Sequence, residues 1–311
     1  MRYAPLLALA ATLLGSCVTY TVDEGWFFRP REIARKAATP AEMRLDGEQN
    51  LLAHGKFTAD LSRVFPAFAE RIPAQVAHDF VDIGDLRIAT TRVTAANATS
   101  GEPLIVACMG QTGDRIQSGL TYIAKTLPWG EVLLVDYPGY GDSSGAPTLA
   151  AFAKFQEGLA AYLDKAAAGR PLVLWGHSLG GPVCSAMAAK SREADAMVLE
   201  TTVPSFNDLM DARKPWFTPP TFDLQLVDGL DAYDIPKSLA GFQGPILVIG
   251  AGQDSVLPVA KQRLLAEKLK AAGLAITYVE IEKSEHLNAA LNTIFVAEAS
   301  PFFATITDLR H

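Results

Sequence analysis

Short, continuous apolar segments recur along the chain from residue 104 onward. They span residues 104–108, 132–136, 172–175, 196–200, 246–249 and 275–281. Apolar positions that run continuously, rather than alternating with polar ones, are typical of strands buried on both faces of a sheet. The last segment alternates more than the others, which predicts a strand nearer an edge of that sheet.

The stretches between these segments carry apolar residues at steps of three and four, the spacing of an amphipathic helix. This spacing predicts helices over residues 149–168, 259–271 and 288–299. Strands that alternate with helices form parallel sheets with helices on both faces. The sequence therefore predicts an α/β fold with a mostly parallel central sheet. Two further β-type segments, 76–81 and 86–93, predict a hairpin that opens the main domain, residues 76–311.

Two regions follow neither rhythm. Residues 17–75 have mixed polarity, with helical patterns only at 30–36 and 61–70. We expect an N-terminal helical extension that packs on the main domain or spaces it from a membrane. Residues 203–243 are rich in proline, and we expect them to form a small cap, because long insertions in compact domains are more often functional than idle. Three aromatic residues of this cap either line an apolar pocket or pack the cap onto the sheet: Trp216, Phe217 and Phe222.

Residues 1–16 differ from the rest of the chain. Arg2 precedes the uncharged run 4–14, which ends in Leu14-Gly15-Ser16-Cys17. This pattern is typical of a secretory signal peptide, and the run is shorter than the roughly 20 residues that span a bilayer. The ending resembles the bacterial lipobox, which implies removal of residues 1–16 and a lipid anchor on Cys17. We expect an exported protein tethered to the cell envelope, and Val18 rather than Asp after the cysteine favours the outer membrane. The alternative is a secretory signal cut nearby, with Cys17 incidental.

The composition is that of a globular protein, with 49% hydrophobic residues, 20% charged residues and a net charge of -7. This balance offers no basic footprint for nucleic acid. No Cys or His spacing is typical of a metal site, and we expect no metal and no organic cofactor. Cys108 and Cys184 lie in apolar segments. An exported location permits a disulfide, but we expect two separate buried thiols.

The motif Gly176-His177-Ser178-Leu179-Gly180 follows one of the apolar segments and precedes a run of small residues. It fits G-x-S-x-G, the strained strand-to-helix turn that exposes a serine hydroxyl and needs small residues on both sides. The helix that follows leaves the backbone N–H of Leu179 free, and its dipole favours a developing negative charge. This context favours a nucleophilic Ser178 over a structural serine in a glycine-rich turn.

A serine hydroxyl is a poor nucleophile until a base takes its proton. His286, just after the last apolar segment, is the candidate base. The other histidines precede the core, support the turn itself or end the chain: His54, His78, His177 and His311. Asp254, in the loop after residues 246–249, is the candidate acid. Three glutamates compete with it: Glu200 at the end of another segment, and Glu282 and Glu285 near His286.

From about residue 76 onward, the chain resembles the α/β-hydrolases, in particular small esterase-like and serine-aminopeptidase-like members. The resemblance rests on the segments 136–145, DYPGYGDSSG, and 176–181, GHSLGG. It implies a triad of Ser178, Asp254 and His286. Where relatives have His-Gly, this chain has Met109-Gly110, and alignment on the glycine implies that the backbone N–H of Gln111 joins that of Leu179 in an oxyanion hole. Asp114 and Arg115 follow in the same loop and either bind substrate or form an ion pair that fixes the loop.

These groups predict two-step acyl transfer on a small-molecule substrate, with an ester or thioester of an apolar acyl group as the first choice. A peptide amide is an alternative, because the same groups cleave it. A non-catalytic binding protein, tethered to the membrane and carrying an unused triad, is another, because a fold alone does not decide function.

Overall fold

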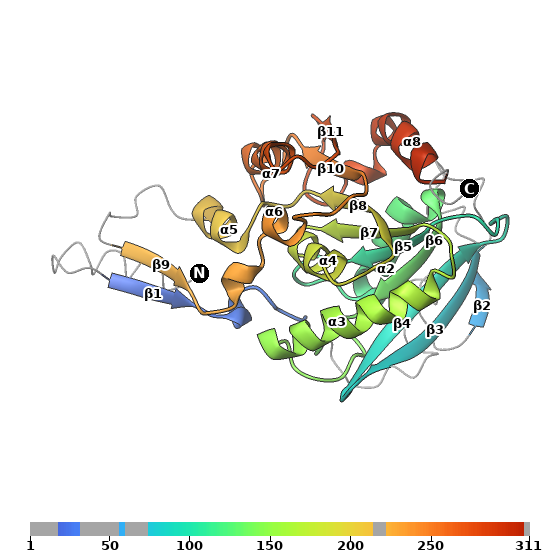
Figure 1. Cartoon of the computed structure of the whole chain (residues 1–311), viewed down its shortest axis with the longest axis horizontal. Coiled ribbons are helices and arrows are strands. Elements are labelled where there is room, and N and C mark those ends of the chain that lie inside the picture. The colour runs from blue at the N-terminus through green and yellow to red at the C-terminus, as the bar shows by residue number, and fades with distance from the viewer. Residues whose placement is uncertain (1–17, 32–55, 60–73, 214–221, 308–311) are drawn as a thin grey trace.

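The computed structural model describes residues 18–31, 56–59, 74–213 and 222–307. Within these residues, nine strands form one sheet in the order β11-β10-β8-β7-β5-β6-β4-β3-β2, with helices on both faces (Figure 1). Its parallel strands are β5 (Leu104–Cys108), β6 (Glu131–Val135), β7 (Leu172–His177), β8 (Ala194–Glu200), β10 (Ile246–Ala251) and β11 (Ile276–Ile281). The prediction of an α/β fold with a mostly parallel central sheet is confirmed.

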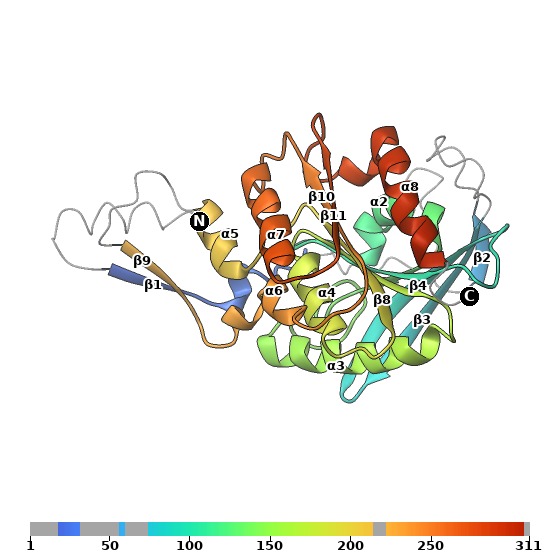
Figure 2. The ribbon, with the colours of Figure 1, turned by 45° about the horizontal axis from the view of Figure 1, so that its top comes forward.

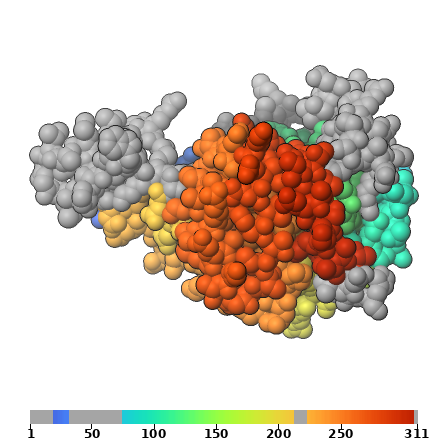
Figure 3. All heavy atoms as spheres, turned by 90° about the horizontal axis from the view of Figure 1, so that it is seen from above, coloured from blue at the N-terminus to red at the C-terminus, as the bar shows by residue number. Residues whose placement is uncertain are grey.

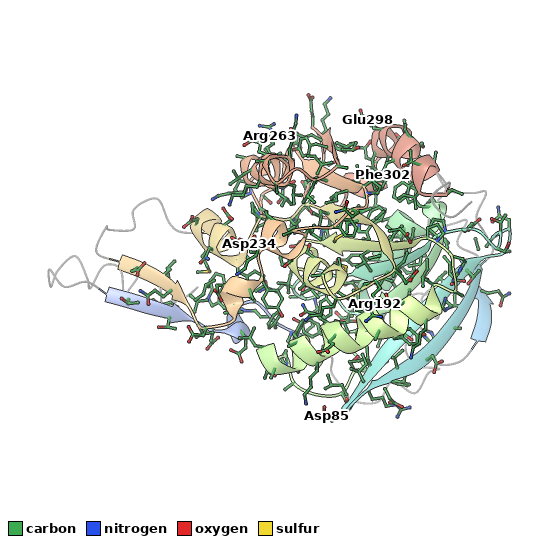
Figure 4. The ribbon with its side chains drawn as sticks, in the orientation of Figure 1. Asp85, Arg192, Asp234, Arg263, Glu298 and Phe302 are labelled. Carbon is green, nitrogen blue, oxygen red and sulfur yellow. A yellow bond between two sulfur atoms is a disulfide. The ribbon has the colours of Figure 1, made fainter. Side chains whose placement is uncertain are left out.

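The antiparallel part of the sheet lies beside β6. It consists of β4 (Leu86–Ala95), β3 (Ala74–Ile83) and β2 (Lys56–Ala59). The predicted hairpin is β3–β4, and Figure 4 shows Asp85 at its tip. Gly84 has a φ of +59° there, a left-handed conformation that glycine adopts without a steric penalty.

The helices divide between the two faces of the sheet (Figure 2). One face is covered by α3 (Leu149–Ala166), α4 (Gly180–Ala188) and α7 (Val259–Ala271), and the other by α2 (Arg115–Thr126) and α8 (Thr293–Thr307). Neighbouring residues of one strand serve opposite faces. Val106 belongs to the apolar cluster of Phe155 on α3, and Ile105 to that of Phe295 on α8. A strand buried on both faces must therefore be apolar throughout.

The strand β11 forms an edge of the sheet, as its alternating pattern predicted. Seen from above, the C-terminal part of the chain, in orange and red, forms the centre of one surface (Figure 3). Arg263 on α7 reaches back to Glu280 on β11, with Nη2 2.6 Å from the carboxylate. Charged side chains beside an edge strand hinder pairing with another chain.

Where the structure describes the N-terminal extension, residues 18–31 contain a strand and a short 3-10 helix, and residues 56–59 form the strand β2. The strand β1 (Val18–Val22) pairs in parallel with β9 (Phe222–Leu226) of the cap region. The two strands lie side by side, away from the main sheet (Figures 1 and 2). A short 3-10 helix, η1 (Glu24–Trp26), then leads to Phe27 and Phe28, which are buried. The helical pattern at 61–70, and all of 30–36 except its first two residues, lie outside the described residues.

The described part of the cap region consists of α5 (Phe206–Arg213), β9, η5 (Leu230–Ala232) and α6 (Ile235–Ser238). Two of the three aromatic residues predicted to act there, Trp216 and Phe217, lie outside the described residues, as does the side chain of Phe222. Their predicted role stays a prediction.

Cys108 and Cys184 form a disulfide, with their Cα atoms 5.9 Å apart. The prediction of two separate thiols is wrong. Cys108 is the last residue of β5, and Cys184 lies on α4, which packs against β5 and β7. The bond therefore joins the strand before Gln111 to the helix after Ser178.

In the ranges that the structure covers, no helix is long and apolar enough to cross a bilayer. The predicted signal segment and Cys17 lie outside these ranges.

Candidate active site

Ser178 occupies a sharp turn between β7 and α4. Its φ is +54°, in the left-handed region that is strained for a residue with a side chain. The neighbouring glycines are required by close backbone contacts. A Cβ on Gly176 would lie 2.5 Å from the carbonyl oxygen of Gly180, and a Cβ on Gly180 would lie 1.9 Å from that of Cys108. The G-x-S-x-G spacing thus corresponds to a strained turn of the predicted kind.

Two hydrogen bonds hold this turn in place. The N–H of Ser178 donates to the carbonyl oxygen of Glu200 at 2.9 Å, and the hydroxyl of Thr202 donates to the carbonyl oxygen of Ser178 at 2.7 Å. Both partners belong to the end of β8 or the loop after it. The neighbouring strand therefore supports the conformation of the serine.

The imidazole of His286 and the carboxylate of Asp254 are hydrogen-bonded, with Nδ1 and Oδ2 2.7 Å apart. The Asp254 side chain is fully buried and that of His286 is 12% exposed. Oδ1 of Asp254 accepts the backbone N–H groups of Val256 and Leu257, each at 2.8 Å. Oδ2 also accepts Nε2–H of Gln262 at 2.8 Å. Three donors thus orient the carboxylate that orients the imidazole.

Ser178 and His286 line the same cleft, which has a volume of about 500 Å³. Among the described residues, neither Ser178 Oγ nor His286 Nε2 makes a hydrogen bond. In unliganded hydrolases the contact between nucleophile and base is often long and tightens when substrate binds. The ends of β7, β10 and β11 therefore bring the three predicted groups to one edge of the sheet, with the serine and the histidine open to the cleft.

Glu200, the main rival of Asp254, has other partners. Its Oε1 lies 2.7 Å from Nζ of Lys125, and both side chains are fully buried. Its Oε2 accepts Nε1–H of Trp175 at 3.0 Å. Glu282 and Glu285 are exposed. Of the four carboxylates considered, Asp254 is the one that contacts the ring of His286 in the described part of the chain.

Gln111 and Leu179 line the same small cavity as Ser178. Within the described ranges, neither of their backbone N–H groups has a hydrogen-bond partner. Leu179 stands at the start of α4, where a helix leaves its first N–H groups unsatisfied. Both groups therefore have a free hydrogen-bond donor near Ser178.

Hydrogen bonds with two other segments fix the Gln111 loop. Tyr137 donates its hydroxyl to the carbonyl oxygen of Met109 at 2.7 Å, and Tyr140 donates to that of Gln111 at 3.0 Å. Nε2 of Gln111 donates to the carbonyl oxygen of Trp26 at 2.7 Å. Met109 itself is fully buried. The loop is thus held firmly, although methionine replaces the histidine that relatives carry there.

Asp114 and Arg115 do not form the expected ion pair with each other. The Asp114 carboxylate accepts the first N–H groups of α2 and caps this helix. Arg115 is 2% exposed, and its guanidinium pairs with Asp136 at 2.9 Å and with Asp142 at 2.8 Å. Burial raises the pKa of Asp136 to about 6, although the positive charge of Arg115 lowers this pKa. These ion pairs join the start of α2 to the loop after β6, whose tyrosines hold the Gln111 loop.

His177 connects the three loops around the site. The N–H of Gly110 donates to the hydroxyl of Tyr122 at 2.9 Å, and this hydroxyl lies 2.8 Å from Nδ1 of His177. Nε2 of His177 lies 3.0 Å from the carbonyl oxygen of His286. A carbonyl oxygen only accepts, so Nε2 carries the proton, Nδ1 accepts from Tyr122, and Tyr122 accepts from Gly110. Burial, with the nearby charge of Lys125 and the ring of His286, holds the pKa of His177 well below its usual range.

Two contributors to this site carry no motif that predicts them. Gln262 is fully buried on α7 and donates to Asp254, although in sequence it is one polar position of an amphipathic helix. Phe27 borders Ser178 from the N-terminal segment. Burial of a polar residue, or of an aromatic residue far along the sequence from the main domain, is visible only once the chain is folded.

No group of His, Cys, Asp or Glu side chains in the described ranges is arranged to hold a metal ion.

Residues 130–219 match a family model described as the alpha/beta hydrolase fold. Over 174 residues, the chain is 33% identical to an uncharacterised protein of Mycobacterium tuberculosis. The matched region covers 55% of this chain and 57% of that protein. The chain is also 28% identical over 174 residues to the lysophosphatidylserine lipase ABHD12 of Danio rerio. This matched region covers 51% of this chain and 45% of the lipase. The chain thus spans about half the length of these curated relatives.

The solved structure of Est1E from Butyrivibrio proteoclasticus, with ferulic acid bound, is similar at a TM-score of 0.54 and 16% identity. The similarity covers 74% of this chain and 96% of Est1E. At this identity, the similarity shows the fold alone. Together with the family match, it shows that the protein has the α/β-hydrolase fold, as the motifs predicted.

Proposed function

We propose that the protein is a serine hydrolase that cleaves a carboxylic ester or thioester through an acyl-enzyme. Ser178 is the nucleophile, His286 the general base and acid, and Asp254 the group that orients His286. The backbone N–H groups of Gln111 and Leu179 form the oxyanion hole. The observation that carries the proposal is the bond from His286 Nδ1 to the buried Asp254 carboxylate, beside a serine held in a strained, open turn.

The chemistry follows from this arrangement. Nε2 of His286 takes the proton of Ser178 as Oγ attacks the carbonyl carbon. The carbonyl oxygen becomes negative and accepts the N–H groups of Gln111 and Leu179. As the bond to the alcohol or thiol breaks, His286 returns the proton to the leaving group, and the acyl group remains on Ser178. Water then gives a proton to His286 and attacks the acyl carbon. As the bond to Oγ breaks, His286 passes this proton to Ser178, which releases the carboxylic acid and restores the serine.

The surroundings of Ser178 support an ester that joins an apolar acyl group to a polar alcohol. A small cavity on one side of the serine is bordered mainly by apolar side chains, including Phe27, Phe206 and Leu257. The larger cleft on the other side is less apolar, since many polar side chains border it beside the exposed Val256 and Leu287. An apolar acyl group and a polar alcohol match these two sides. The lipase among the relatives acts on an ester and is consistent with this class.

Labelling with a fluorophosphonate and hydrolysis of p-nitrophenyl esters test the proposal, with Ser178→Ala as the matched variant. We expect the wild type to label and to cleave esters, and Ser178→Ala to do neither. Activity that survives in Ser178→Ala would overturn the assignment of the nucleophile. A folded wild type that neither labels nor cleaves would favour the non-catalytic binding protein. Faster cleavage of peptide p-nitroanilides than of esters would favour the amidase.

We also propose that residues 1–16 are a signal peptide and that Cys17 carries a lipid anchor at the cell envelope, in the outer membrane. The support comes from the Leu14-Gly15-Ser16-Cys17 pattern. Since β1 begins at Val18 and pairs with β9, this anchor would attach directly beside the cap strand, without a spacer. Mass spectrometry of the mature N-terminus tests the proposal, and an unmodified start at any other residue would refute it.

A further inference from the structure

The two cavities beside Ser178 differ sharply in size. The apolar one has a volume of about 20 Å³, whereas the polar cleft has about 500 Å³. A cavity that holds a single water molecule has a volume of about 10–15 Å³ on the same scale. The apolar side of Ser178 therefore has room for one group the size of a methyl, and the polar side for a much larger one.

Ser178 and Gln111 border both cavities. A substrate whose carbonyl carbon is attacked by Ser178, with its oxygen on the N–H of Gln111, extends in two directions from this point. Because hydrocarbon is favoured against apolar side chains and water-like groups against polar ones, the acyl chain enters the small cavity. The alcohol then occupies the polar cleft.

Phe27 closes the small cavity from outside the hydrolase domain. It is fully buried, and its ring stacks on that of Phe206 of α5, with centroids 3.9 Å apart and an angle of 7° between the planes. Phe206 and Leu209 of the cap border the same cavity. The wall is thus formed jointly by the cap and the N-terminal segment.

Three ties fix the position of Phe27. Its N–H donates to the carbonyl oxygen of Glu24 at 3.0 Å. The residue before it, Trp26, accepts Nε2–H of Gln111 at 2.7 Å. The strand β1 pairs with β9 along its whole length, from Val18 to Val22. An aromatic ring held by the oxyanion loop and the cap together is a fixed wall and not a mobile side chain.

We propose that Phe27 limits the acyl group to a short one such as acetyl, so that the natural substrate is a short-chain ester of a larger, hydrogen-bonding alcohol. This inference rests on the proposed ester hydrolysis and deepens it. It assigns a specificity-determining role to the N-terminal segment, which neither the G-x-S-x-G motif nor the triad involves. A longer acyl chain needs the space that the ring of Phe27 fills.

Phe28 provides the matched control. It lies next to Phe27, is 2% exposed and stacks on Phe152 of α3 with centroids 3.9 Å apart. Phe28 is not one of the described residues that border the small cavity. Phe27→Ala and Phe28→Ala therefore remove the same buried group from the same segment, but only Phe27 borders the cavity directly. Phe28 contacts the wall residue Phe206 only edge-on, with centroids 6.3 Å apart.

The test measures kcat/KM for p-nitrophenyl acetate, butyrate and octanoate, with active sites counted by fluorophosphonate titration. A methylene group that does not fit an apolar pocket costs about 10–200-fold, so we expect the wild type to favour acetate over octanoate by at least about 10-fold. Phe27→Ala raises the ratio of octanoate to acetate by at least about 10-fold, and Phe28→Ala leaves this ratio unchanged. Phe27→Leu, a milder truncation, shifts the ratio in the same direction and serves if Phe27→Ala does not fold.

Two results would overturn the inference while leaving the hydrolase intact. One is a wild type that labels with fluorophosphonate and cleaves octanoate as efficiently as acetate. The other is an unchanged ratio in a folded, labelled Phe27 variant. A wild type that neither labels nor cleaves any ester would instead overturn the proposed function itself, and this inference with it.

Discussion

The imidazole of His177 donates its Nε2–H to the backbone carbonyl oxygen of His286, at 3.0 Å. The residue before the nucleophile thus holds the loop of the base. We expect His177→Ala to lower kcat by about 10–100-fold with little change in KM, because a misplaced catalytic group costs rate more than binding. In His177→Gln, the amide nitrogen takes the place of Nε2 and keeps the donor. We expect this variant to stay nearer to the wild type, and equal kcat values for the two variants would contradict the positioning role.

The same histidine makes stability depend on pH. Its pKa is lowered in the folded protein, so below about pH 6.5 the unfolded chain binds a proton that the folded chain does not. The free energy of unfolding therefore falls as the pH drops through 6.5. For His177 alone, the loss between pH 7.5 and 5.5 is about 1 kcal/mol. Urea unfolding at both pH values, compared between wild type and His177→Gln, isolates this contribution, since the other groups titrate in both proteins.

Asp254 should matter for turnover far more than Glu200. We expect Asp254→Asn to lower kcat by about 10⁴-fold, because the amide favours the wrong tautomer of His286. Glu200→Gln should keep kcat per active site, since Glu200 has no contact with the ring of His286. Steady-state kinetics with titrated active sites compare the two. A larger loss of kcat in Glu200→Gln would return Glu200 to the role of the acid.

The buried Lys125–Glu200 pair should matter for stability instead. Removing one charge leaves the other buried and unpaired, so Lys125→Met should lower the free energy of unfolding by about 3–5 kcal/mol. The double variant Lys125→Met with Glu200→Leu should lose less than the single variant, because no buried charge remains. Denaturant unfolding measures both. A double variant less stable than Lys125→Met would contradict this account.

The disulfide between Cys108 and Cys184 closes a loop of 76 residues. A loop of this length corresponds to a stabilisation of about 2–5 kcal/mol through the unfolded state. We expect Cys108→Ala with Cys184→Ala to lower the midpoint of thermal unfolding, and reductant to lower that of the wild type. Since reductant has no disulfide to act on in the double variant, its midpoint should not change. An equal effect of reductant on both proteins would show that the bond is not its target.

The groups predicted from the sequence share one property, which is a local signature. Ser178 has glycines at a fixed spacing that the strained turn requires, and Asp254 and His286 each follow an apolar segment directly. The sheet was predictable for the same reason, because strands buried on both faces leave continuous apolar runs. Position within a recurring pattern was enough to place these residues at one edge of the sheet.

The features that escaped prediction depend on contacts between distant segments. Whether Cys108 and Cys184 form a disulfide depends on how α4 packs on β5. The apolar sequences around the two cysteines do not indicate this packing. The strand β1 does alternate in sequence, Val18-Thr19-Tyr20-Thr21-Val22, but nothing local indicates that its partner is β9 of the cap. Gln262 and Phe27 act through burial, which a single polar or aromatic position does not indicate. In each case the missing information was tertiary.

The pairing of β1 with β9 has a consequence for how the chain folds. Val18 pairs with Phe222, a residue made about 200 positions later, and contacts this remote in sequence form slowly. During synthesis, β1 remains an unpaired strand edge, a state prone to aggregation. The first strand of the described chain is thus among the last to find its place, and the pocket beside Ser178 is completed only when the two distant segments meet.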